Sequence, residues 1–154
     1  FDPYQGYISG NYKDDYFYYD KNYGTLIGYP SSYDSDKQVN DHHFHYGYWI
    51  KAAAAVAMEK PEWAKEWGDM VYEMIGDIAN VHRDGKGYNE NSSTRYPFLR
   101  NFDIYEGHSW ASGVANYEYD ENGELVDKKG GLAGGNNQES SSESVNAWAS
   151  AIMI

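Results

Sequence analysis

The sequence predicts a mainly α-helical fold in which helices are joined by long polar loops. Three segments carry a helical signal, residues 40–59, 61–80 and 139–154. They hold an unbroken row of helix formers, apolar residues at spacings of three and four, and a capped hydrophobic run, respectively. The stretches between them are rich in Gly, Asn, Asp and Ser, which favour turns over regular structure.

Residues 1–36 are expected to form loops and short strands. Glycine and proline recur there among aromatic pairs, and no run keeps a helical period. The best strand candidates are residues 17–20 and 25–29, which are short and bounded by turn residues.

The first helix is predicted to begin at Asn40 or Asp41, either of which can cap it, and to continue through an alanine row to Glu59. Pro61 then opens the second helix at its first turn, where proline is tolerated. The short link between the two predicts antiparallel neighbours. The second helix has one apolar face, formed by Trp63, Trp67, Met70, Val71, Met74, Ile75 and Ile78.

The remaining chain is expected to be mostly irregular. Residues 81–107 lack any period, and so long a stretch in a compact domain is more often a functional loop than an accident. A short helix is expected at residues 107–115. Residues 116–137 are polar and glycine-rich and predict an exposed excursion, after which the third helix begins near residues 138–140.

Composition narrows the possible partners. Acidic residues outnumber basic ones 24 to 12, giving a formal charge of -12. The electrostatic field of this negative charge repels nucleic acid and anionic lipid surfaces. No window approaches the roughly 20 apolar residues of a membrane-spanning helix. The absence of cysteine excludes disulfides, thiolate nucleophiles and cysteine-zinc sites.

Aromatic residues make up 18% of the chain, and too few aliphatic residues accompany them for every ring to lie in a core. Half-exposed rings that keep a polar group suit a surface that binds neutral amphipathic ligands such as sugars. Tyrosine-rich loops that pack under one another are the alternative, and we favour it for any single tyrosine between residues 4 and 33.

The segment from Asp41 to Tyr48 places a carboxylate beside three imidazoles at a helix start, where a structural role needs only one capping side chain. Asp41 and His45 are four residues apart and share a helix face, and Tyr48 falls close to it. If apolar rings raise its pKa, Asp41 could act as a general acid. The alternative is that Asp41 only caps the helix. For His42 and His43 individually, packing is the favoured role.

A metal site is a further alternative, in which Asp41, His43 and His45 would serve a metal-dependent hydrolase. The spacing argues against a single centre, because His42 and His43 point about 100° apart on a helix.

Glu139 and Glu143 are also four residues apart, just before a hydrophobic run. Two anions on adjacent turns repel, which an ordinary surface helix avoids, although a helix N-terminus partly offsets this near Glu139. That dipole would keep Glu139 ionised, as a general base requires. A capping box formed by Ser140 and Glu143 is the alternative, and it leaves Glu139 unexplained.

Between these segments lie Asp103, Glu106, His108 and Trp110, which could line a sugar subsite by stacking and by hydrogen bonds to hydroxyl groups. A core position for Trp110 is an equally open alternative.

Three blocks in this order, Asp41–Gly47, Gly107–Ala111 and Glu139–Glu143, closely resemble the signature blocks of glycoside hydrolase family 81, the endo-β-1,3-glucanases. Residues 18–30, which precede the first of these blocks, also resemble the sequences of this family. The resemblance covers roughly residues 16–150.

The resemblance implies an (α/α)6 barrel catalytic domain, of which residues 1–154 would be an incomplete segment. It also implies endo-cleavage of laminarin-type β-1,3-glucan with inversion and without a metal or other cofactor. Asp41 would be the general acid and Glu139 the general base that activates water. Glu143 would support that water or share the role.

The resemblance further assigns substrate contacts to His45, Asp103, His108 and Trp110. The excursion at residues 116–137 is longer than this family predicts and could reshape one end of the cleft. A polymeric substrate implies an extracellular, secreted enzyme. A non-catalytic carbohydrate-binding module, suggested by the aromatic residues alone, is the other alternative to a glucanase.

Overall fold

The computed structural model describes residues 16–83, 96–113, 118–119, 121–122, 125–127 and 136–154, and about half of these are helical. The helices are α1 (Ser35–Gln38), α2 (His42–Glu59), α3 (Pro61–Ala79) and α4 (Ser141–Met153). The strands are β1 (Tyr16–Asp20), β2 (Thr25–Tyr29), β3 (Phe102–Asp103), β4 (His108–Ser109), β5 (Glu118–Tyr119) and β6 (Leu125–Asp127). Consecutive strands pair as three small antiparallel sheets.

The mainly helical prediction agrees with this architecture, and most element bounds differ from the predicted ones by one or two residues. The helix predicted to begin at residue 139 begins at Ser141, because Glu139 has a left-handed backbone with φ of 58°. Strands β1 and β2 occupy the two segments singled out in the sequence, in register from Tyr16 opposite Tyr29 to Asp20 opposite Thr25.

The helix predicted at residues 107–115 is wrong within the described residues 107–113. Strand β4 occupies part of this segment, and the rest is irregular. Its backbone N–H groups find distant partners instead of helical ones: Trp110 donates to the carbonyl of Asn101 and Ala111 donates to that of Asn137. Much of the excursion at residues 116–137 lies outside the described residues, and the described part holds the β5–β6 hairpin.

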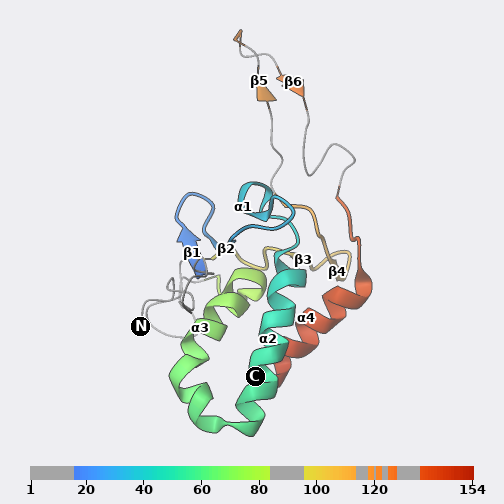
Figure 1. The fold of residues 1–154 in the computed structure, drawn as a ribbon. Helices are drawn as coiled ribbons and strands as arrows, with labels where there is room; N and C mark the ends of the chain where they lie inside the picture. Colours follow the sequence, from blue (N-terminus) through green and yellow to red (C-terminus); the bar gives the residue numbers. More distant parts are fainter. Residues whose placement is uncertain (1–15, 84–95, 114–117, 120, 123–124, 128–135) are drawn as a thin grey trace.

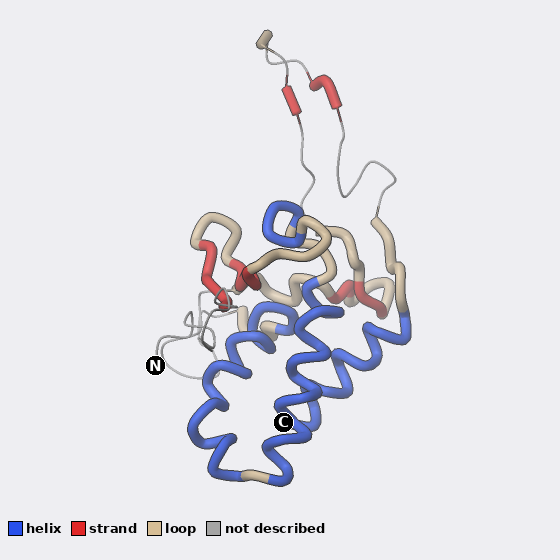
Figure 2. The backbone as a smooth tube through the Cα atoms, in the orientation of Figure 1, coloured by secondary structure: helices blue, strands red, loops and turns tan. Residues whose placement is uncertain are grey.

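Helices α2 and α3 are antiparallel, joined through Lys60, and α4 packs on the other side of α2 (Figures 1 and 2). Gly47 makes the contact with α4 possible, since a Cβ at this position would lie 2.7 Å from that of Ala147. No helix among the described residues has the length and apolar character needed to cross a bilayer.

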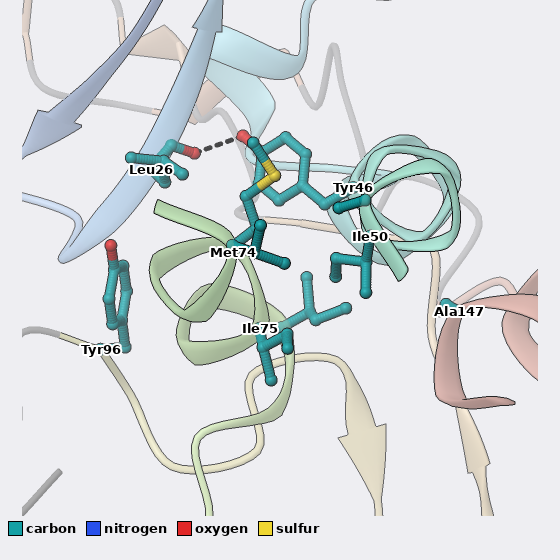
Figure 3. Close-up of a cluster of buried hydrophobic side chains, with 10 residues drawn as sticks. Leu26, Tyr46, Ile50, Met74, Ile75, Tyr96 and Ala147 are labelled. Carbon is teal, nitrogen blue, oxygen red and sulfur yellow. Dashed lines mark hydrogen bonds between the residues drawn. The ribbon is translucent and has the colours of Figure 1, made fainter. Parts of the chain in front are cut away.

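The hydrophobic core lies between the helices and the β1–β2 hairpin (Figure 3). The hydroxyl of Tyr46 donates to the carbonyl of Leu26, so the first turns of α2 are tied to β2. The core therefore anchors the N-terminal end of α2. The buried side chains of this core are Leu26, Tyr46, Ile50, Ala53, Val71, Met74, Ile75, Ile78, Tyr96 and Ala147.

The buried carboxylate of Asp77 joins α3 to β2 and to the N-terminal end of α2 through hydrogen bonds. Its Oδ1 accepts from the hydroxyl of Thr25 and the N–H of Leu26, both at 2.8 Å, and its Oδ2 lies 2.8 Å from Nδ1 of His42. Arg100 lies 3.4 Å from Oδ1. Burial alone raises the pKa of Asp77, but the charge and hydrogen bond of His42, together with Arg100, outweigh burial and lower it.

We predict that Asp77→Asn lowers the free energy of unfolding by about 3 kcal/mol, because it removes one member of a buried ion pair. Since the folded-state pKa is depressed, this contribution is complete above the unfolded pKa near 3.8 and is lost as pH falls below it. Calorimetry of the protein at pH 7 and at low pH measures both effects. Asp69→Asn is the matched control, an exposed aspartate on the same helix. Equal unfolding temperatures for the two variants at pH 7 would contradict the prediction.

Candidate active site

The N-terminal ends of α2 and α4 lie at the same end of the helical layer, beside the β3–β4 hairpin (Figure 1). Two backbone hydrogen bonds join them through the loop after β4. The N–H of Asp41 donates to the carbonyl of Ala111 at 2.9 Å, and the N–H of Ala111 donates to the carbonyl of Asn137 at 2.7 Å. Three segments that are far apart in the sequence therefore meet at one place.

Asp41 is the N-cap residue of α2, but its side chain accepts no capping hydrogen bond. Its backbone carbonyl accepts from Phe44 and His45, both at 3.0 Å. Its φ is 59°, a left-handed conformation that aspartate tolerates better than most residues. The capping alternative thus holds for the backbone of Asp41 and is wrong for its side chain.

The carboxyl of Asp41 is half-buried. Burial, and after it the negative charge of Glu139, raises the pKa of Asp41, while His45, Asn40 and His42 act in the opposite direction. A carboxyl that is free of capping and retains its proton to higher pH is suited to proton donation.

Glu139 lies outside α4, so it does not share a helix face with Glu143 as the spacing predicted. Its left-handed backbone is held by a hydrogen bond from its N–H to Oδ1 of Asn137 at 2.9 Å. The N–H of Ser140 donates to the carbonyl of Gln138 at 2.7 Å. Glu139 is exposed, and its negative charge contributes to raising the pKa of Asp41.

The capping box is only half formed. Ser140 caps α4, because its Oγ accepts the N–H of Glu143 at 3.3 Å. The Glu143 carboxylate instead reaches α2, where its Oε1 accepts the hydroxyl of Tyr48 at 3.0 Å. Glu143 is therefore held at the border between the two helices.

His45 lies one turn into α2, four residues after Asp41. Burial lowers its pKa, against the opposing effects of Asp41 and Glu143. The ring of Tyr33, which is 80% exposed, lies 6.0 Å from the His45 ring. A neutral imidazole and an accessible phenol at this position can both hydrogen-bond to hydroxyl groups.

His42 and His43 are completely buried and join helices, as expected of packing histidines. His42 bonds Asp77 on α3. His43 donates through Nε2 to the hydroxyl of Ser144 at 3.2 Å, since that hydroxyl itself donates to the carbonyl of Ser140. Burial and the neighbouring histidines lower the pKa of His43 to about 4.

This placement bears on the metal-site alternative. The Nε2 of His43 is engaged by Ser144 in the α2–α4 interface, away from the face shared by Asp41 and His45. Among the residues that the structure describes, no three His, Cys, Asp or Glu side chains are arranged to hold a metal ion. The described side chains thus offer that alternative no ligand set.

The β3–β4 hairpin carries Asp103, His108 and Trp110 as one cluster. Asp103 accepts the turn N–H groups of Tyr105 and Glu106 through Oδ1 and the indole N–H of Trp110 through Oδ2 at 3.1 Å. These bonds, the indole first, lower the pKa of Asp103. The His108 ring packs edge-on against Trp110, with centroids 4.4 Å apart.

Trp110 directly precedes Ala111, whose carbonyl bonds the N–H of Asp41, so the cluster is coupled to the acidic pair through the backbone. Within the described part of the chain, no side-chain hydrogen bond or ring contact connects the cluster to Asp41 or Glu139. Trp110 is half-buried, so it lies neither fully in the core nor fully at the surface.

Two residues next to the site were not identified as functional from the sequence. The side chain of Asn40 donates to Oδ2 of Asp41 at 2.7 Å, and Tyr33 lies beside His45. The position of Asn40 next to Asp41 is visible in the sequence, but there it indicates only a possible cap. No sequence signal points to Tyr33, because a turn of the chain brings it to α2.

Comparison with known proteins supports one family. Residues 2–154 match the model of the glycosyl hydrolase family 81 C-terminal domain. The chain is 55% identical over 139 residues to a glucan endo-1,3-beta-D-glucosidase of Acetivibrio thermocellus, covering 89% of this chain and 15% of the relative. It is 44% identical over 140 residues to the enzyme of the same name from Thermobifida fusca, covering 90% and 15%.

Among solved structures, a mutant of a family 81 glycoside hydrolase from Clostridium thermocellum superimposes with a TM-score of 0.71 at 55% identity. The superposition covers 89% of this chain and 16% of that one. The chain therefore spans about 15% of the length of the curated relatives given above.

Proposed function

Because this chain belongs to glycoside hydrolase family 81, we propose that it is part of an endo-acting enzyme that hydrolyses β-1,3-glucan of the laminarin type. The observation that carries the proposal is that backbone bonds to the loop after β4 join the segments preceding α2 and α4, which contain Asp41 and Glu139, and that the pKa of Asp41 is raised first by burial and then by Glu139. Residues 1–154 would form one segment of an (α/α)6 barrel; their coverage of only 16% of the solved family member supports their being a segment of a larger protein.

In this mechanism Asp41 is the general acid and protonates the glycosidic oxygen as the bond breaks. Glu139 is the general base and removes a proton from a water molecule that attacks the anomeric carbon from the opposite face. This displacement inverts the anomeric configuration, and it needs about 6.5 to 9.5 Å between the carboxyl groups to accommodate the water. The raised pKa of Asp41 favours its role as the acid, because burial makes this carboxyl retain its proton to higher pH.

Glu143 supports the attacking water or shares the role of the base. Its bond to Tyr48 leaves one carboxylate oxygen for that purpose. His45 contacts the substrate, and Trp110 offers its half-buried ring for stacking against a sugar. His108 and Asp103 complete this subsite, and Asp103 also orients Trp110 by accepting its indole N–H.

No metal or other cofactor takes part in these steps, since the two carboxyl groups supply both proton transfers. The partner is a β-1,3-glucan polysaccharide or oligosaccharide. A polymer of this size cannot enter a cell, so we place the enzyme outside it.

The decisive experiment follows the product anomers by proton NMR while the complete enzyme cleaves soluble β-1,3-glucan, with and without a chelator. We expect the α-anomer to appear first, at equal rates in both samples. If the β-anomer appears first, the reaction proceeds with retention and the role of Glu139 is wrong. Loss of activity with the chelator would instead support the metal-dependent hydrolase.

A carbohydrate-binding module is the remaining candidate, favoured by exposed aromatic residues such as Tyr33 and Trp49. It predicts that glucan binds without any release of reducing ends. The same NMR experiment distinguishes the two, since a binding module leaves the anomeric signals unchanged.

A further inference from the structure

Asn40, the residue before the proposed acid, bonds the acid directly. Its Nδ2 lies 2.7 Å from Oδ2 of Asp41 and 3.4 Å from the backbone carbonyl of Tyr33. The carbonyl of Tyr33 can only accept a hydrogen bond, and Oδ2 of Asp41 accepts one whenever it carries no proton. The carboxamide therefore turns its NH2 group toward them, because a flipped amide would set its oxygen against the carbonyl oxygen of Tyr33.

The other end of the amide contributes no hydrogen bond. The Oδ1 of Asn40 is buried and has no hydrogen-bond partner within the described residues. A buried acceptor without a partner is unfavourable, so the amide gains nothing at its oxygen from this arrangement. The orientation is thus determined at the nitrogen, by the bonds to Tyr33 and Asp41.

From this geometry we infer that Asn40 is a positioning residue for the acid, which confines the transferable proton of Asp41 to Oδ1. A proton on Oδ2 would point at the N–H donor, whereas Oδ1 receives no hydrogen bond from any described group. Oδ1 is then the atom that faces the glycosidic oxygen. This inference rests on the proposed role of Asp41 as general acid.

The same bond changes during the reaction. As Asp41 loses its proton, Oδ2 gains negative charge and the hydrogen bond from Asn40 becomes charge-assisted and stronger. A contact that strengthens on proton transfer lowers the barrier more than it tightens substrate binding. Loss of Asn40 is therefore expected to lower kcat more than it changes KM.

Removing the bond should also raise the pKa of Asp41, because a donor to a carboxylate stabilises its charged form. The other groups whose charge acts on this carboxyl are Glu139 from the segment before α4, and His45 and His42 from α2. None of these is altered by a change at Asn40. The alkaline limb of the profile of kcat/KM against pH, where the acid loses its proton, should accordingly move to higher pH.

The test compares Asn40→Ala and Asn40→Asp in the complete enzyme. For Asn40→Ala we expect kcat to fall roughly 10-fold and the alkaline limb to move up by about half to one pH unit. Asn40→Asp keeps the shape but replaces the donor by an acceptor, so both effects should be larger. On an aryl glucoside with an acidic leaving group, which needs little protonation, the loss of kcat should nearly vanish.

Asn80→Ala is the matched control. Its amide also donates to a backbone carbonyl, that of Tyr96 at 2.6 Å, but it has no contact with Asp41. A lower unfolding temperature with an unmoved alkaline limb is expected there. The same result in both Asn40 variants would overturn the inference and leave Asn40 a purely structural residue.

Asp41→Asn, measured in parallel, separates this inference from the proposed function. If Asp41→Asn is inactive and the alkaline limb of the pH profile does not move in the Asn40 variants, only the positioning role of Asn40 is wrong. If Asp41→Asn remains active, the general acid has been misassigned and the proposed function fails first.

Discussion

In the complete enzyme, Asp41→Asn is expected to lower kcat for β-1,3-glucan by about 10³-fold, within the usual contribution of a general acid. Asparagine has nearly the same shape and tolerates the left-handed backbone at this position, but it cannot donate a carboxylic proton. Glucan binding, measured by calorimetry or on immobilised polymer, should stay close to that of the unmodified enzyme. Hydrolysis at more than a tenth of the original rate would exclude Asp41 as the acid.

Asp34→Asn provides a matched control for this variant. Asp34 is the N-cap residue of α1, has a φ of 55° and makes no capping hydrogen bond through its side chain, which resembles the setting of Asp41. It lies on the surface, 3.5 Å from Lys37, and has no part in the proposed site. Full activity of Asp34→Asn would show that the loss at Asp41 comes from its proton and not from the cap position.

Glu139→Gln is expected to abolish hydrolysis to a similar degree, about 10³-fold or more, because an amide cannot accept the proton of the attacking water. Its response to rescue should differ from that of Asp41→Asn. Azide needs no deprotonation, so it should restore turnover of an activated β-glucoside in Glu139→Gln and give an α-configured glycosyl azide. An acidic leaving group alone should rescue Asp41→Asn and leave Glu139→Gln inactive.

Glu66→Gln is the corresponding control, an exposed glutamate on α3. It should retain its activity on glucan. If azide yields a β-configured product in Glu139→Gln, the reaction proceeds through a covalent intermediate with retention of configuration. If Glu139→Gln cleaves glucan normally while Glu143→Gln does not, the base is Glu143.

Several features of the fold were accessible from the sequence because their signals are local. The alanine row of α2, Pro61 at the start of α3 and the apolar face of α3 need no distant partner to indicate a helix. The two strands of the first hairpin are likewise bounded by turn residues in the sequence. The three signature blocks were sufficient to indicate the family to which the chain belongs.

Other predictions depended on contacts between distant segments. The segment at residues 107–113 has helix-compatible residues, yet Trp110 and Ala111 bond backbone carbonyls at Asn101 and Asn137. A helix in that segment would lose both bonds. Asp103 was predicted only to line a sugar subsite, and the sequence did not reveal that its oxygens accept hydrogen bonds from its own turn and from Trp110.

The amino-acid sequence therefore determined by itself the family, the helical segments and the acidic residues on which a mechanism could depend. The tertiary structure decided which atoms of these acidic residues are left without a hydrogen bond and how deeply they are buried. The loop after β4 bonds the backbones of Asp41 and Asn137 from two sides, so that Asp41 is half-buried, freed from capping and within reach of the charge of Glu139. Burial and partner choice arise from segments that only packing brings together, and these set a carboxyl group's pKa and orientation.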